Sequence, residues 1–167
     1  MTETAPAMNL PDGRFSGRVE FAQLIRLAFA AAAGQGWQSI ILSDCTFEDW
    51  PLGERAVAQS LNDWSMSGRK LTMLARNYDE VGRRHARFGM WRRTWSHIVD
   101  CRANTAILHD DFPSALWSPV WMLRRLDLSR STGVSSIQPG RRIALKEQLE
   151  ACLKLSSPAF ASTTLGL

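Results

Sequence analysis

The spacing of apolar residues alternates along the chain between helical intervals and short runs, which predicts an α/β protein. A first helix is marked by apolar side chains three and four positions apart: Phe21, Leu24, Ile25, Ala28 and Phe29. Residues 37–43 follow, and their short, β-branched apolar run predicts a buried central strand. The fold is therefore expected to begin with a helix that leads into a strand.

The same alternation continues through the middle of the chain. Apolar spacing predicts two more helices and two more strands, at residues 52–65 (helix), 70–76 (strand), 79–94 (helix) and 97–102 (strand). Because a helix separates each strand from the next, the strands are expected to be parallel neighbours joined by crossovers. Residues 103–118 contain Asn, Asp and Pro and are predicted to form a loop.

The last third of the chain predicts a hairpin and a helix. Residues 121–128 and 134–138 are two strand-like segments separated by a turn that contains Ser and Gly, which favours antiparallel pairing. Pro139 suits the first position of a final helix, and Pro158 is expected to end it.

These elements predict one α/β domain over residues 18–158, with a mixed, mostly parallel sheet flanked by helices. Residues 1–17 are expected to be a flexible N-terminal tail and residues 159–167 a C-terminal tail.

Composition narrows the class of protein. The chain has 167 residues, of which 45% are hydrophobic and 22% charged, as in a globular domain. Cys45, Cys101 and Cys152 are odd in number and widely spaced, which predicts reduced thiols. No apolar run is long enough to span a bilayer, and the N-terminus lacks the pattern of a signal peptide. We therefore expect a cytoplasmic protein without a membrane partner.

An acidic loop follows the predicted central strand and is one candidate ligand-binding site. Ligands of open α/β sheets gather beyond the carboxyl ends of strands, where this loop places Asp44, Cys45, Glu48, Asp49 and Trp50. Its carboxylates could bind a hard cation. The structural alternative, which we favour, is that Asp44 caps the turn and that Glu48 and Asp49 are solvated, while the apolar residues of the loop pack on the core.

His97 extends this candidate site to a possible enzyme. Strand alternation and strand rise place Asp100 on the opposite face from His97 and Cys101 ~13 Å away, so neither pairs with it in the same strand. His97 could still meet Asp44 or Cys45 from a neighbouring strand end, giving a hydrolase-like or phosphodiesterase-like site. The alternative is that the cysteine is inert packing.

Residues 83–95 form a basic and aromatic segment in a chain of net charge +4. Its arginines are candidate ligands for an anion or a nucleic acid: Arg83, Arg84, Arg87, Arg92 and Arg93. On a single helix, Arg84 shares the arc of the aromatic residues, while Arg83 and Arg87 project from the other side. The segment could follow a phosphate backbone, with an aromatic ring for stacking. Alternatively, the aromatics are a buried face and the arginines are solvated or paired.

Several common sites are not predicted. The chain has no Gly-x-Gly-x-x-Gly and no Gly-Lys-Ser/Thr phosphate loop, and its His and Cys residues lack the spacing of a zinc site. We therefore predict no cofactor and no metal.

The order of elements resembles one lobe of the phospholipase D-like fold. More narrowly, the chain from Val19 onward resembles a family of uncharacterised proteobacterial proteins through four segments: residues 47–52, 84–88, 91–97 and 157–167. Active members of the phospholipase D superfamily carry His-x-Lys-x-x-x-x-Asp on a strand. Alignment on Asp127 puts Val120 at the histidine position and Met122 at the lysine position. The resemblance thus implies a degenerate lobe without phosphodiesterase activity, and a homodimer, because single-lobe members pair.

The sequence leaves three hypotheses for function. The first is a non-catalytic phospholipase D-like domain that binds a protein partner or a small ligand. The second is a nucleic-acid-binding protein that uses the segment 83–95. The third is an enzyme with a non-standard site near Asp44, Cys45 and His97.

Overall fold

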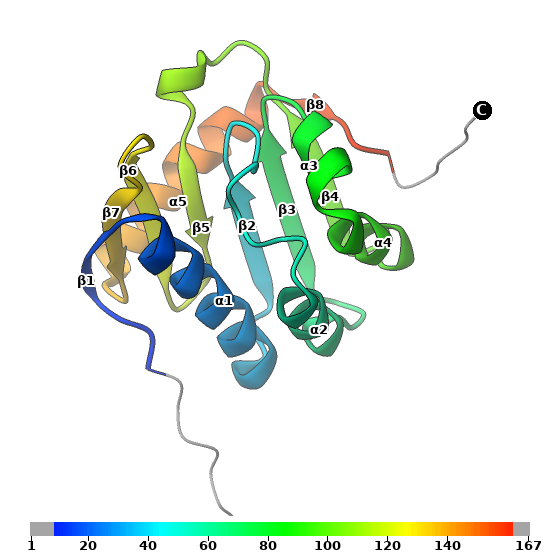
Figure 1. Cartoon of the computed structure of the whole chain (residues 1–167), viewed down its shortest axis with the longest axis horizontal. Coiled ribbons are helices and arrows are strands. Elements are labelled where there is room, and N and C mark those ends of the chain that lie inside the picture. Colours follow the sequence, from blue (N-terminus) through cyan, green and yellow to red (C-terminus); the bar gives the residue numbers. More distant parts are fainter. Residues whose placement is uncertain (1–8, 162–167) are drawn as a thin grey trace, which may run out of the picture.

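The computed structural model describes residues 9–161. Its helices are α1 (Arg18–Gln35), α2 (Arg55–Trp64), α3 (Asp79–Arg84), α4 (Ala86–Thr94) and α5 (Pro139–Lys154), with a 3₁₀ turn at His109–Asp111. Its strands are β1 (Gly13–Ser16), β2 (Ser39–Ser43), β3 (Lys70–Ala75), β4 (Val99–Ala103), β5 (Ser114–Trp117), β6 (Met122–Asp127), β7 (Thr132–Ser136) and β8 (Ser157–Pro158). Helices α1 to α4 cover one face of a single sheet and α5 lies behind it (Figure 1).

The predicted α/β class is confirmed, but the sheet is mostly antiparallel. Over residues 9–161 the strand order is β1-β7-β6-β5-β2-β3-β4-β8. The pairs β2–β3 and β3–β4 are parallel, as the crossover pattern predicts, whereas the other five neighbouring pairs are antiparallel. The predicted hairpin is confirmed as β6 and β7.

The prediction of a mostly parallel sheet was wrong because three short strands were missed. Strand β5 lies inside the predicted loop 103–118, and all four of its side chains are buried, so it has no alternating pattern. Strand β1 lies in the predicted N-terminal tail, and β8 has only two residues. The remaining parts of the two predicted tails, 1–8 and 162–167, lie outside the described residues.

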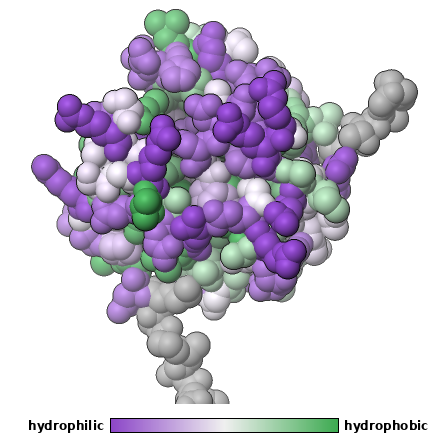
Figure 2. Space-filling view, in the orientation of Figure 1, coloured by the Kyte–Doolittle hydropathy of each residue, from purple (hydrophilic) through white to green (hydrophobic). Residues whose placement is uncertain are grey.

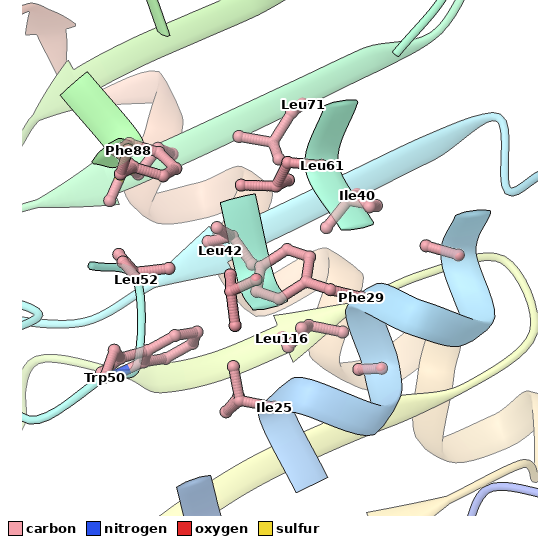
Figure 3. Packing of buried hydrophobic residues seen from close by; sticks show 14 of the residues in the cluster. Ile25, Phe29, Ile40, Leu42, Trp50, Leu52, Leu61, Leu71, Phe88 and Leu116 are labelled. Carbon is pink, nitrogen blue, oxygen red and sulfur yellow. The ribbon is translucent and has the colours of Figure 1, made fainter. Parts of the chain in front are cut away.

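The main core lies between the sheet and helices α1 to α4. Figure 3 shows Leu42 of β2 and Phe29 of α1 meeting Trp50 of the acidic loop, all at 2% exposure or less. A smaller cluster behind the sheet joins Leu145 and Leu149 of α5 to strands β2, β5 and β6. In residues 9–161 no helix has the length and apolarity needed to cross a membrane.

The predicted helix 79–94 is broken into two at His85. The backbone of His85 leaves helical geometry at φ −121° and ψ 57°, between α3 and α4. Its ring Nε2 lies 2.7 Å from the carbonyl oxygen of Phe47, which accepts a hydrogen bond from that nitrogen. The break also brings the chain close to Gly53, where a Cβ would lie 2.9 Å from the backbone oxygen of Arg84. Helices α3 and α4 are thereby anchored to the acidic loop.

Candidate functional site

Two carboxylates of the acidic loop, those of Asp44 and Asp49, are held by Arg125 of β6, which is separated from β2 by one strand. Arg125 of β6 donates from Nη2 to Asp44 at 3.0 Å. It also forms a two-pronged pair with Asp49, at 2.5 Å from Nη1 and 3.1 Å from Nη2. Neither carboxylate is therefore presented to a cation, which agrees with the structural role.

The Arg125 side chain has all five of its N–H donors in use. Ser114 accepts from Nε at 3.1 Å and Ser131 from Nη1 at 3.2 Å, while the guanidinium lies 4.1 Å from the centre of the Phe21 ring. Burial alone lowers the pKa of Arg125, but hydrogen bonds and charges from Asp49 and Asp44 outweigh it and raise the pKa. The group stays charged, and we call Arg125, Asp44 and Asp49 the buried ion triad.

The rest of the acidic loop follows the structural alternative except at Asp49, which pairs with Arg125 and is not freely solvated. Asp44 Oδ2 accepts the backbone N–H of Phe47 at 2.8 Å and of Thr46 at 3.3 Å, so the predicted cap is confirmed. Trp50 is buried, whereas Glu48 is exposed. Burial raises the pKa of the Cys45 thiol, which leaves it protonated and unreactive at neutral pH. In residues 9–161 no group of His, Cys, Asp and Glu is arranged to hold a metal ion.

His97 does not meet the acidic loop. It precedes β4, whereas Asp44 and Cys45 follow β2, and these strands run parallel through β3. The histidine therefore lies at the amino ends of these strands, opposite the acidic loop at their carboxyl ends. There it borders a separate cavity together with Arg69 and Lys70. The enzyme hypothesis built on these three residues was wrong. A residue that precedes one parallel strand and a residue that follows another lie at opposite ends of the strands, so they cannot meet.

Four of the five arginines of segment 83–95 are exposed: Arg83, Arg84, Arg87 and Arg93, which we call the arginine surface. Arg83 and Arg84 both pair with Glu80, at 2.9 Å and 2.5 Å. Arg87 donates to the neutral backbone oxygen of Gly53 at 2.8 Å. Figure 2 shows that the helical face of the molecule is largely hydrophilic. The arginine surface thus carries more positive charge than its own carboxylates neutralise.

The break at His85 changes which arginine is buried. The single-helix prediction placed Arg84 among the aromatics, but the Arg84 side chain is 55% exposed and Arg92 is 8% exposed. Phe88 and Trp91 are buried in the core, so they cannot stack on a base. Trp95 is half-buried and tilts against His97. The four exposed arginines of this segment therefore remain available for phosphate contacts, whereas Arg92 and the two buried rings do not.

The two positions that the phospholipase D resemblance singles out carry no polar group. Val120 lies in the turn between β5 and β6 and is 46% exposed. Met122 begins β6 and is buried against α5. Neither side chain can act as a nucleophile or bind a phosphate.

The sequence analysis missed Arg125. Alternation places Arg125 on the same face as the apolar Leu123, but its acidic partners are 76 and 81 residues away, so the sequence did not reveal the pairing.

Comparisons with known proteins bear on the fold of the chain. No protein-family model matches the chain, and no curated protein matches it. The chain is similar in structure to TrmBL2, described as an archaeal chromatin protein with a novel mode of DNA binding. The TM-score is 0.62 at 12% sequence identity, over 95% of this chain and 57% of that one. At this identity the likeness establishes the fold alone, and this chain spans little more than half the length of that protein.

Proposed function

We propose that this protein binds nucleic acid without catalysing a reaction, by placing the arginine surface against the phosphate backbone. The observation that carries the proposal is that Arg83 and Arg84 share one carboxylate, that of Glu80, while Arg87 and Arg93 add two further exposed charges. Surface ion pairs are worth about 0–1 kcal/mol, so a phosphate can compete for these guanidinium groups. TrmBL2, which has a similar fold, is described as binding DNA, and this supports a nucleic-acid-binding function.

This function requires no sequence readout. Arginine contacts to phosphates supply affinity and position the protein but do not distinguish bases. The buried state of Phe88 and Trp91 favours binding to a duplex backbone over stacking along a single strand.

We also propose that the protein is a degenerate phospholipase D-like lobe, which lacks the catalytic histidine and lysine of that fold. In the sheet, β5 joins the β6–β7 hairpin to the parallel β2-β3-β4 unit. Val120 and Met122, which replace the expected histidine and lysine, support a role without phosphodiesterase chemistry.

We expect the protein to be a homodimer in solution. Apolar side chains near the start of α5 are exposed, with Val120 at 46%, Ile137 at 55% and Ile143 at 58%, and a second copy would cover them. Two arginine surfaces on one particle would also raise avidity for a duplex. Light scattering at micromolar concentration should give twice the 18.7 kDa chain mass; a monomer at that concentration would contradict the prediction.

Charge reversal on the arginine surface is expected to remove most duplex binding. Each phosphate contact contributes about −0.9 to the slope of log affinity against log salt for B-DNA, so Arg83→Glu with Arg87→Glu should reduce that slope by about 2. At 50 mM salt we expect at least about a tenfold loss of affinity. Fluorescence anisotropy with a 30-base-pair duplex at several salt concentrations measures both quantities.

The matched control carries Arg14→Glu and Arg130→Glu, which change the net charge equally. Arg14 lies in β1 and Arg130 in the β6–β7 turn, at the far end of the sheet from α3 and α4 (Figure 1). If net charge alone mattered, the two pairs would weaken binding to the same extent. That result, or a wild-type affinity that does not change with salt, would contradict the proposal.

A further inference from the structure

The rear face of the sheet, on the side of α5, is covered over only part of its area. Helix α5 starts after β7 and ends next to β8, which pairs with the carboxyl end of β4, so the helix crosses behind the sheet at an angle (Figure 1). Its last turn contributes Cys152 and Leu153 to an apolar cluster with Leu74, near the carboxyl end of β3. A cavity of about 380 Å³ lies beside the helix, toward the amino ends of β2, β3 and β4. The cavity occupies the part of the rear face that α5 leaves open.

The floor of this cavity is one row of paired residues that changes from apolar to polar along its length. In the strand register, Ile41 of β2 lies between Trp117 of β5 and Thr72 of β3. Asp100 of β4 continues the row beyond Thr72. Paired residues point to the same face of a sheet, and all four line the cavity. The side of the cavity under α5 is therefore apolar, and the side toward β4 is polar.

Two loose ion pairs and one unpaired lysine surround the cavity. Arg102 Nη1 lies 3.8 Å from Asp100 Oδ1, and Lys146 Nζ lies 3.8 Å from Glu150 Oε1. Both distances are too long for a direct hydrogen bond. Among residues 9–161 no carboxylate lies within ion-pair distance of Lys70. Three cations and two carboxylates line the cavity, which gives it a net charge of +1.

Two hydroxyl groups on the floor have hydrogen-bonding capacity that the protein leaves unused. Ser39 pairs with Lys70 across β2 and β3, and Thr72 lies two residues after Lys70 on the same face. Both side chains are half-buried and line the cavity, and neither forms a hydrogen bond with any residue in the described range 9–161. An ammonium group and two hydroxyls on adjacent strands form a set of donors for an oxyanion.

We infer that this cavity binds a small monocarboxylate that has an apolar body. The carboxylate lies against Lys70, Ser39 and Thr72, and the apolar body lies against Ile41 and Leu153. Apolar side chains together with a few placed polar groups are typical of small-molecule sites, and the volume falls within their range of about 300–1,000 Å³. The net charge of +1 suits one carboxylate rather than a phosphate dianion. The site lies on the opposite face of the sheet from the arginine surface, so the inference goes beyond the proposed function and does not depend on it.

The first test compares indole-3-acetate with indole-3-acetamide, which has nearly the same shape but no charge. In a protein NMR titration, indole-3-acetate should shift the backbone amide signals of Ile41, Thr72 and Asp100. Because Lys70 is exposed, its ion pair with the carboxylate should make the acetate bind about fivefold more tightly than the amide. Equal affinities, or shifts centred on α3 and α4, would overturn the inference.

Replacing the unpaired lysine tests the role of its charge. Lys70 is exposed, so Lys70→Gln should fold normally, bind indole-3-acetate about fivefold more weakly and leave the affinity for indole-3-acetamide unchanged. The matched control, Arg93→Gln, removes one positive charge from the arginine surface and should change neither affinity. If the control weakened acetate binding as much as Lys70→Gln, the preference would come from the net charge of the protein, and the inference would be wrong.

A cavity-filling variant tests the position of the ligand. Thr72→Phe places a large side chain on the floor of the cavity, in a residue type that strands favour, and should abolish binding of both compounds. Binding retained in Thr72→Phe would contradict the inference. Absence of indole-3-acetate binding to the wild-type protein, with salt-dependent duplex binding intact, overturns this site and leaves the proposed function standing. Acetate binding that Lys70→Gln weakens, in a protein that does not bind a duplex, supports this site and contradicts only the proposed function.

Discussion

Replacing Arg125 by methionine is expected to lower the free energy of unfolding by about 3–5 kcal/mol, because it leaves two carboxylates without their cation. The side chains of Arg125 and Asp44 are only 3% and 6% exposed, and that of Asp49 is 26% exposed. Methionine is close in length, so the loss comes from the buried charges rather than from a large cavity. Urea denaturation followed by tryptophan fluorescence measures the change.

Two further variants separate the buried ion triad from general effects on β6. Arg124→Met changes the neighbouring residue, which points to the other face and is partly exposed, and should cost less than about 1 kcal/mol. Adding Asp44→Asn and Asp49→Asn to Arg125→Met should recover part of the loss, because no unpaired charge remains buried. A triple variant that is less stable than Arg125→Met would show that the charges are not the source of the effect.

Gly133→Ala is expected to destabilise the protein by about 3 kcal/mol through overpacking. A Cβ at this position would lie 2.1 Å from the backbone oxygen of Arg124 and 2.7 Å from Cζ of Phe15. Gly133 is paired with Phe15 on one side and Arg125 on the other, so both neighbouring strands would have to move. Thermal or urea unfolding measures the loss.

The control is Gly140→Ala in the first turn of α5, where nothing lies within 4 Å of an added Cβ. Alanine there should raise the free energy of unfolding by no more than about 1 kcal/mol. If Gly133→Ala were as mild, the packing of β7 between β1 and β6 would be looser than the structure indicates.

The two stability predictions concern one region of the molecule. The register shift between Arg125 and Asp127 is a bulge in the β6–β7 pair, and bulges turn a side chain toward a new direction. Gly133 lies opposite Arg125, and a Cβ on it would meet the backbone of β6. The close approach and the buried ion triad therefore depend on the same local geometry, and the two variants are not expected to be additive.

The local parts of the fold could be predicted from the sequence. Helix α1 has a clear stripe of apolar residues, and β2 and β3 are apolar runs bounded by turn residues, so neighbouring positions alone define them. The cap formed by Asp44 is equally local, since its acceptors serve N–H groups two and three residues ahead. Pro139 at the start of α5 follows from the fixed φ of proline.

The tertiary structure alone decided which charged residues are buried and which are exposed. The position of each such residue depends on contacts with residues that are distant in the sequence. Arg84 is exposed instead of lying among the aromatic residues, and Arg92 is buried, because the helix breaks at His85, where the chain contacts Phe47 and approaches Gly53. His97 is separated from the acidic loop by the parallel direction of the strands.

The sequence by itself determined the α/β class, the main helices and the surplus of arginine in segment 83–95, since periodicity and composition are properties of neighbouring residues. Only the tertiary structure decided that the acidic loop is locked by Arg125, that four arginines face outward, and that Arg92 is buried beside Phe160. Burial and ion pairing arise from contacts between residues distant in the chain, and no local pattern encodes them.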